Sequence, residues 1–109
     1  MSDTAMPEAI RAFVDTTNAG DSEGFVAAFT EDAYVNDWGR EFHGREGVAS
    51  WNESDNIGRN AHVEAHAIRT GRLPGQYLLT VTVSGGGYNG PGVFTFDLRD
   101  GLIARFLIA

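Results

Sequence analysis

The chain has 109 residues, no cysteine and a formal net charge of −7 at pH 7, which fits a single domain over residues 1–109. The negative charge argues against nucleic-acid and anionic-membrane partners, because such binding depends largely on Lys and Arg. The lack of Cys excludes disulfides, thiolate metal sites and a Cys nucleophile, and no signal peptide is evident, so we expect a cytoplasmic protein.

Two short helices are predicted at the N-terminal end. The first begins near Pro7, and the residues that recur at helical spacing on its buried face are Ile10, Phe13 and Val14. It ends at residues 18–20, where Asn-Ala-Gly suits a left-handed C-terminal residue. Asp21 or Ser22 then caps a second helix. The buried face of that helix is expected to consist of Phe25, Val26 and Phe29.

A short strand and a third helix follow. The strand covers Tyr34–Asp37, and after a turn at Trp38-Gly39 the segment Glu41–His43 pairs back with it antiparallel. The third helix begins after residue 44, carries Val48 and Trp51 on its buried side, and ends near residues 56–58. The strand therefore ends in a carboxylate between aromatic side chains, where a pocket is expected.

From residue 61 onward the hydrophobic periodicity changes to two, which is typical of strands. Four longer antiparallel strands are expected over residues 61–70, 77–84, 94–99 and 102–108. The Gly-rich segments 71–75 and 85–92 are interpreted as hairpin turns. The second lacks the Lys-Ser/Thr ending and the following helix of a phosphate-binding loop. Helices that precede such a sheet indicate an α+β fold with the helices on one sheet face.

The last strand is apolar on both sides. Leu102, Phe106 and Ile108 are expected to face one way, and Ile103 and Leu107 the other. One face packs on the helices and the other needs a cover, so we predict a homodimer through the outer face of the sheet. The alternative is an edge strand covered by a loop of the same chain.

Three polar residues share a face of the predicted strand 61–70, namely His62, Glu64 and His66. Alternate strand positions are roughly 6.8 Å apart, so the two histidines are separated by roughly 13 Å at the backbone and cannot easily share one metal ion. No third partner for His62 and Glu64 is evident, and no metal site is predicted. His66 either faces the pocket as a donor or proton shuttle, or is a solvated strand residue.

The order of these features resembles the nuclear transport factor 2-like superfamily, and within it the ketosteroid isomerase-like and SnoaL-like small proteins. The resemblance runs from residue 7 to the C-terminus. It rests on Asn18-Ala19-Gly20-Asp21, Phe29-Thr30-Glu31-Asp32-Ala33, Asp37, and Phe42-His43-Gly44-Arg45-Glu46-Gly47-Val48 before Trp51. It implies a cone-shaped, curved, mostly antiparallel sheet wrapped around the N-terminal helices, as in cystatin-like folds. A pocket at the open end and dimerisation through the sheet are also implied.

The resemblance further implies roles for individual residues. In ketosteroid isomerases an Asp at this strand end is the general base, and Asp37 occupies the matching position. Those enzymes stabilise the enolate with a Tyr on the first helix and a protonated Asp on a late strand. Phe13 and Phe94 stand at the apparent positions of these donors. One such donor is worth roughly 2.7–4 kcal/mol in the transition state, so steroid isomerase activity is not predicted.

Two functions are compatible with a pocket at Asp37. The first is a cofactor-independent enzyme in which Asp37 is the general base of an isomerisation, cyclisation, dehydration or hydrolysis of an apolar cyclic substrate. The second is a noncatalytic module that binds a hydrophobic small molecule or dimerises, with Asp37 a turn carboxylate. The expected substrate-binding residues are Phe13, Tyr34, Trp38, Trp51, His66, Tyr77 and Phe94. Core packing is the alternative role of Phe13 and Trp51.

Overall fold

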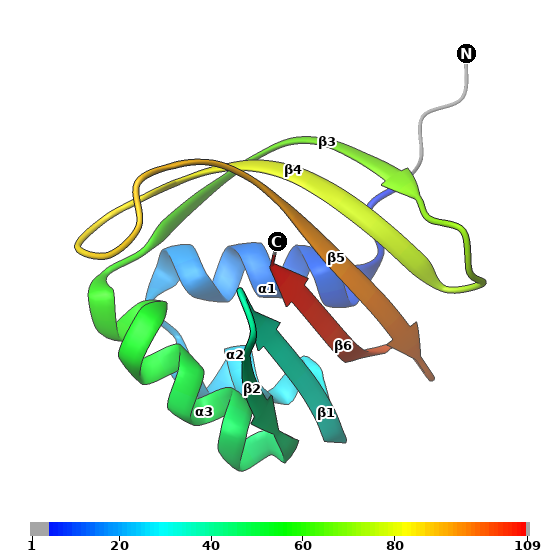
Figure 1. The fold of residues 1–109 in the computed structure, drawn as a ribbon, viewed down its shortest axis with the longest axis horizontal. Coiled ribbons are helices and arrows are strands. Elements are labelled where there is room, and N and C mark those ends of the chain that lie inside the picture. Colours follow the sequence, from blue (N-terminus) through cyan, green and yellow to red (C-terminus); the bar gives the residue numbers. More distant parts are fainter. Residues whose placement is uncertain (1–4, 109) are drawn as a thin grey trace.

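The computed structural model describes residues 5–108 and has an α+β architecture (Figure 1). The helices are α1 (Glu8–Ala19), α2 (Ser22–Ala27), α3 (Gly44–Asp55) and the 3-10 helix η1 (Ile57–Arg59). The strands are β1 (Phe29–Asp37), β2 (Arg40–His43), β3 (His62–Thr70), β4 (Gln76–Ser84), β5 (Gly90–Arg99) and β6 (Leu102–Ile108). None of the helices in the described part is long and apolar enough to cross a membrane. The cytoplasmic location stays a prediction.

The six strands form one open, curved sheet in the order β2-β1-β6-β5-β4-β3. Every neighbouring pair is antiparallel except β1 and β6, which run parallel. In Figure 1, β3, β4 and β5 arch over α1, and α3 lies beside β1 and β2. A register shift between Ala65 and Ala67 interrupts the β3–β4 ladder, and such bulges bend and twist a strand. The structure confirms the expected mostly antiparallel cone around the N-terminal helices.

The helix boundaries follow from their caps. Gly20 ends α1 in the left-handed conformation with φ 72°, as its sequence predicted. Asp21 caps α2, because its side chain accepts a hydrogen bond from the Gly24 backbone N–H at 3.0 Å. The assignment of Phe29 to the second helix was wrong. It begins β1 and pairs with Ile103 of β6, because pairing with the sheet overrides the helical spacing at this point.

The core is a cluster of phenylalanine rings around α1. Phe13 is fully buried, and its ring centroid lies 4.8–6.3 Å from five others. Those five are Phe25, Phe29, Phe94, Phe96 and Phe106. This cluster joins both N-terminal helices to β1, β5 and β6.

The sequence assigned one face of β6 incorrectly. Ile103 is fully buried together with Phe106, although their odd spacing puts them on opposite faces of a regular strand. The ladder to β5 shifts register here, since Ile103 pairs with Leu98 whereas Arg105 pairs with Asp97. A bulge of this kind moves the following side chains to the other face. The outer face of β6 is therefore less apolar than the alternation predicted.

Two strands begin earlier than predicted. β1 begins at Phe29 and β5 at Gly90, whereas the sequence indicated Tyr34 and Phe94. Residues 90–93 pair with β4, although their glycines and Pro91 are typical of a turn. The loop between β4 and β5 is accordingly shorter than expected.

Candidate functional site

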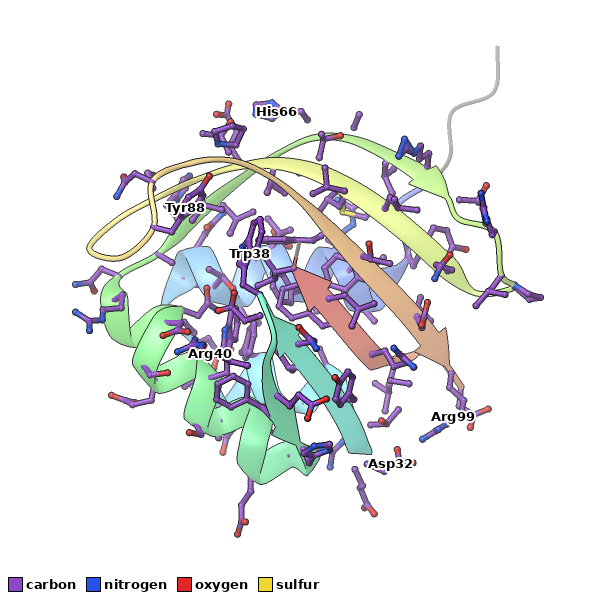
Figure 2. All side chains as sticks on the ribbon, viewed as in Figure 1. Asp32, Trp38, Arg40, His66, Tyr88 and Arg99 are labelled. Atoms are coloured by element: carbon purple, nitrogen blue, oxygen red, sulfur yellow. The ribbon has the colours of Figure 1, made fainter. Side chains whose placement is uncertain are left out.

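A cavity of about 520 Å³ opens at the end of the cone, between α3 and the inner side of strands β3–β5. This volume falls within the range of small-molecule sites, roughly 300–1,000 Å³. Asp37, Trp51 and Phe94 belong to its wall, and its aliphatic lining includes Ala61, Val63, Val83, Pro91 and Ile108. Trp38 and Tyr88 also line it, although they are 76% and 62% exposed. Figure 2 shows these two aromatic side chains on different segments near the open end.

Asp37 ends β1 with its side chain 18% exposed. The indole Nε1–H of Trp51 donates to Asp37 Oδ2 at 3.0 Å, and Arg40 donates to the same oxygen, also at 3.0 Å. Within residues 5–108, no group donates a hydrogen bond to the other oxygen, Oδ1. The carboxylate is therefore held by one oxygen, and the second is free to accept a proton or a hydrogen bond.

Arg40 links two carboxylates at the edge of the cavity. Besides Asp37, its guanidinium pairs with Asp55 near the end of α3. The guanidinium also lies 5.4 Å from the centroid of the Phe42 ring. The Arg40 side chain is 54% exposed, whereas Asp55 is 24% exposed, so the cation lies toward solvent and the carboxylates lie further inside. The two ion pairs of Arg40 therefore join the β1–β2 hairpin to α3.

The hairpin turn presents Trp38 in an uncommon backbone conformation. Trp38 and Gly39 both have positive φ, 53° and 92°, as in a type I′ turn. Gly39 donates its backbone N–H to Asn36 Oδ1 at 2.8 Å, and Trp38 donates its own to the Ile108 carbonyl at 3.1 Å. A non-glycine residue in this region costs about 1–2 kcal/mol. Such strain combined with an exposed tryptophan at a cavity is typical of a binding site.

Asn56 follows α3 and supplies a buried amide to the cavity wall. Its Nδ2 donates to Thr17 Oγ1 at 2.9 Å and to Asn52 Oδ1 at 3.1 Å, so both amide hydrogens are used. Its backbone angles, φ −117° and ψ −104°, lie outside the commonly populated regions. The bond to Thr17 ties the end of α3 to α1, and the bond to Asn52 holds the Asn56 amide against α3.

The structure brings four of the predicted site residues together at the cavity: Asp37, Trp38, Trp51 and Phe94. The other four predicted residues do not line it. Phe13 is enclosed in the phenylalanine core, and Tyr77 packs, partly buried, against the core from β4. Phe13 is therefore a core residue, which was the alternative role predicted for it.

Tyr34 and His66 lie elsewhere for reasons of strand geometry. Tyr34 alternates with the inward-facing Val35, and its hydroxyl donates to Glu41 Oε2 at 2.7 Å. His66 is the residue passed over by the register shift of β3, and its Nε2 lies 2.7 Å from Thr82 Oγ1 at an exposed position. Figure 2 shows His66 on the outer side of the arch.

Sequence reasoning missed Arg40, Asp55 and Asn56. A signal existed for the first, since Arg40 lies directly opposite Asp37 in the hairpin, and opposite charges are favoured at such cross-strand positions. Nothing local marks Asp55 or Asn56 as site residues, because Asp55 pairs with Arg40 of β2 and Asn56 is bonded to Thr17 of α1. No group of three or more His, Cys, Asp or Glu in the described chain could hold a metal ion.

Another ion pair lies at the opposite end of the sheet (Figure 2). Arg99 of β5 pairs with Asp32 of β1, and Thr30 donates to the same carboxylate at 2.9 Å. The hydrogen bond from Arg99, followed by that from Thr30, lowers the pKa of Asp32 below its ordinary value. The same pairing raises the pKa of Arg99. Asp32 therefore offers a carboxylate remote from the cavity for control substitutions.

Comparison with known proteins gives a family and a set of similar folds. The model of the SnoaL-like domain matches residues 10–106. A candidate polyketide cyclase from Sinorhizobium meliloti is 22% identical over 95% of both chains, with a TM-score of 0.81. A Mycobacterium tuberculosis protein in complex with estradiol-17β-hemisuccinate is 20% identical over 92% of this chain and 88% of that one, with a TM-score of 0.80.

A third similar structure is the Δ5-3-ketosteroid isomerase from a Mycobacterium species. It is 22% identical over 93% of this chain and 88% of its own, with a TM-score of 0.77. At such identities the similarity shows a shared fold, and function has to be argued from the site itself. None of the curated proteins matches the chain.

Proposed function

Because the chain belongs to the SnoaL-like domain family, we propose that it is a cofactor-independent enzyme with Asp37 as the general base toward an apolar cyclic substrate. The observation that supports this proposal is the hydrogen bonding of the Asp37 carboxylate. Trp51 and Arg40 hold Oδ2, no group of residues 5–108 donates to Oδ1, and Asp37 lines an aromatic cavity. A positioned carboxylate of this kind can take a proton from a bound carbon acid or hydroxyl and is typically worth 10²–10⁴ in rate.

A generic carbon acid tests the proposal without knowledge of the natural substrate. In 5-nitrobenzisoxazole, removal of the ring C–H proton breaks the N–O bond and yields 2-cyano-4-nitrophenolate, whose absorbance is followed directly. The proton goes to Asp37, and the electron pair of the C–H bond forms the nitrile as the N–O bond breaks. We expect Asp37→Asn to lower kcat/KM by about 10²-fold, since an amide cannot accept the proton.

The matched control is Asp32→Asn, which removes the same charge at the opposite end of the sheet. It should leave kcat/KM within about twofold of the unsubstituted protein. Equal rates for Asp37→Asn and the unsubstituted protein, or no acceleration by either over free acetate, would contradict a base role for Asp37.

The noncatalytic alternative is supported by two other residues. Phe13 and Phe94 carry no hydrogen-bond donor at the positions that stabilise an enolate in ketosteroid isomerases, and their rings pack 5.7 Å apart. A module that only binds a hydrophobic small molecule needs neither donor. Binding of an apolar ring compound without any turnover of the carbon acid would favour this alternative.

We also propose a homodimer through the outer face of the sheet. Leu78, Thr95 and Leu107 form one row across β4, β5 and β6, and the leucines are only partly buried. Sedimentation analysis of Leu107→Glu should show monomers. Leu73→Glu, at a 60% exposed loop residue, is the control that should sediment like the unsubstituted protein. A monomeric unsubstituted protein at micromolar concentration would refute the dimer.

A further inference from the structure

The cavity has an unusual distribution of hydrogen-bonding groups. Donors on its less exposed side chains already have acceptors: the Trp51 indole donates to Asp37, and both Asn56 amide hydrogens are bonded. The Tyr88 hydroxyl donates to the Pro91 carbonyl at 2.7 Å, and the Ser54 hydroxyl donates to the Trp51 carbonyl at 3.4 Å. These groups have no hydrogen left to offer a ligand. The lining donors that retain N–H groups, Trp38, Arg40 and Arg59, are exposed side chains at the rim.

Several oxygen acceptors of the residues that line the cavity, in contrast, have no donor within the described part of the chain. Among residues 5–108, no donor reaches Asp37 Oδ1, and Arg40 pairs with Asp55 through Oδ2. Asn56 Oδ1 accepts no hydrogen bond either, yet no fully enclosed side-chain oxygen of the described chain lacks a partner, so this atom retains accessible surface. The inner wall therefore presents oxygen acceptors beside aromatic and aliphatic surface.

The charges at the cavity argue for a neutral donor. Asp37 and Asp55 together carry two negative charges, and the guanidinium of Arg40 is bound between them. Arg59 adds a second positive charge at the rim, where its Nε donates to the Ser54 carbonyl. The formal charges of these four side chains cancel. An ammonium group would have to displace or approach Arg40, whereas an uncharged hydroxyl does not.

From these observations we propose that the ligand is a ring compound bearing a neutral hydroxyl, which donates to Asp37 Oδ1. The inference rests on the proposed function of the cavity and adds a chemical class to it. In an oxyanion site, donors of the protein bind a carbonyl or enolate oxygen of the ligand. Here, an acceptor of the protein binds a donor of the ligand. An acceptor left without a donor in the complex is costly, so the site should bind hydroxyl-bearing ring compounds more tightly than ring compounds that carry only acceptors.

Three naphthalene derivatives of similar size test this class by calorimetric titration. They are 2-naphthalenemethanol, its methyl ether, and 2-acetylnaphthalene, which carries only an acceptor. We expect the alcohol to bind at least tenfold more tightly than the ether and the ketone. Dissociation constants within twofold of one another would overturn the inference.

The isosteric variant Asp37→Asn gives a sharper test. Trp51 and Arg40 both donate at the Oδ2 position, so the amide oxygen of the variant should take that place and its NH₂ should take the place of Oδ1. The open group then changes from acceptor to donor, and the preference should reverse from alcohol to ketone. Asp32→Asn should keep the original order, as it does not contact the cavity.

The two proposals fail in different ways. An unchanged order of affinities in Asp37→Asn would overturn the hydroxyl-ligand inference, whatever the rate with the carbon acid. A clear alcohol preference with no Asp37-dependent proton transfer would instead overturn the enzyme and leave a selective binding protein. If none of the three compounds binds, the hydroxyl-ligand inference falls, and the enzyme proposal is decided by the Asp37-dependent turnover of the carbon acid alone.

Discussion

Replacement of Trp51 by Phe should destabilise the domain by about 2–3 kcal/mol, because the indole does two things at once. Its Nε1–H donates at 3.0 Å to the Asp37 carboxylate, and a hydrogen bond to a charged group contributes about 1.5–3 kcal/mol. The lower end applies here, since Asp37 retains Arg40. The smaller ring also loses part of its packing against Phe25 and Phe106, at centroid distances of 6.1 and 5.3 Å, for about 1 kcal/mol more.

A double-mutant cycle separates the hydrogen bond from the packing. Urea unfolding followed by circular dichroism should be measured for Trp51→Phe, Asp37→Ala and the double variant. We expect a coupling energy of about 1–1.5 kcal/mol, with the rest of the Trp51→Phe effect independent of residue 37. A coupling below about 0.5 kcal/mol, which is the usual error of additivity, would refute the reasoning and leave Trp51 a packing residue only.

Three other substitutions make further predictions. Asp32→Asn should make the stability measured by thermal unfolding depend less on pH below about pH 4. Because the pKa of Asp32 is lowered in the folded protein, its ion pair stabilises the fold at pH values above the ordinary pKa of an aspartate. This stabilisation is lost as the pH falls through the folded-state pKa. Arg99→Gln, which removes the partner of Asp32, should weaken the same dependence of stability on pH. Asn18→Ala should cost about 1–3 kcal/mol in urea unfolding, because its amide exchanges two hydrogen bonds, of 2.8 and 2.9 Å, with the Val63 backbone. Trp38→Asn should raise stability by about 1 kcal/mol, since Asn-Gly suits a type I′ turn, yet weaken binding of 2-naphthalenemethanol; lower stability would argue against strain at this position.

The half of the candidate site that sequence reasoning found lies on elements with strong local signals. Asp37 and Trp38 end a strand at a glycine turn, and Trp51 recurs at helical spacing. The half that it missed depends on contacts between elements. Arg40 of β2 pairs with Asp55 at the end of α3, and Asn56 is bonded to Thr17, which lies 39 positions earlier in the chain.

The sequence by itself determined the helical segments, the period-two strands and the placement of helices before sheet, because caps, turns and hydrophobic periodicity act over a few neighbouring residues. Only the tertiary structure decided that β1 runs parallel to β6 and that a bulge brings Ile103 inward. It also decided that one oxygen of Asp37 is held while the other is open. Pairing between distant strands and the sharing of hydrogen bonds among side chains depend on which groups meet in space, and a local pattern does not record this.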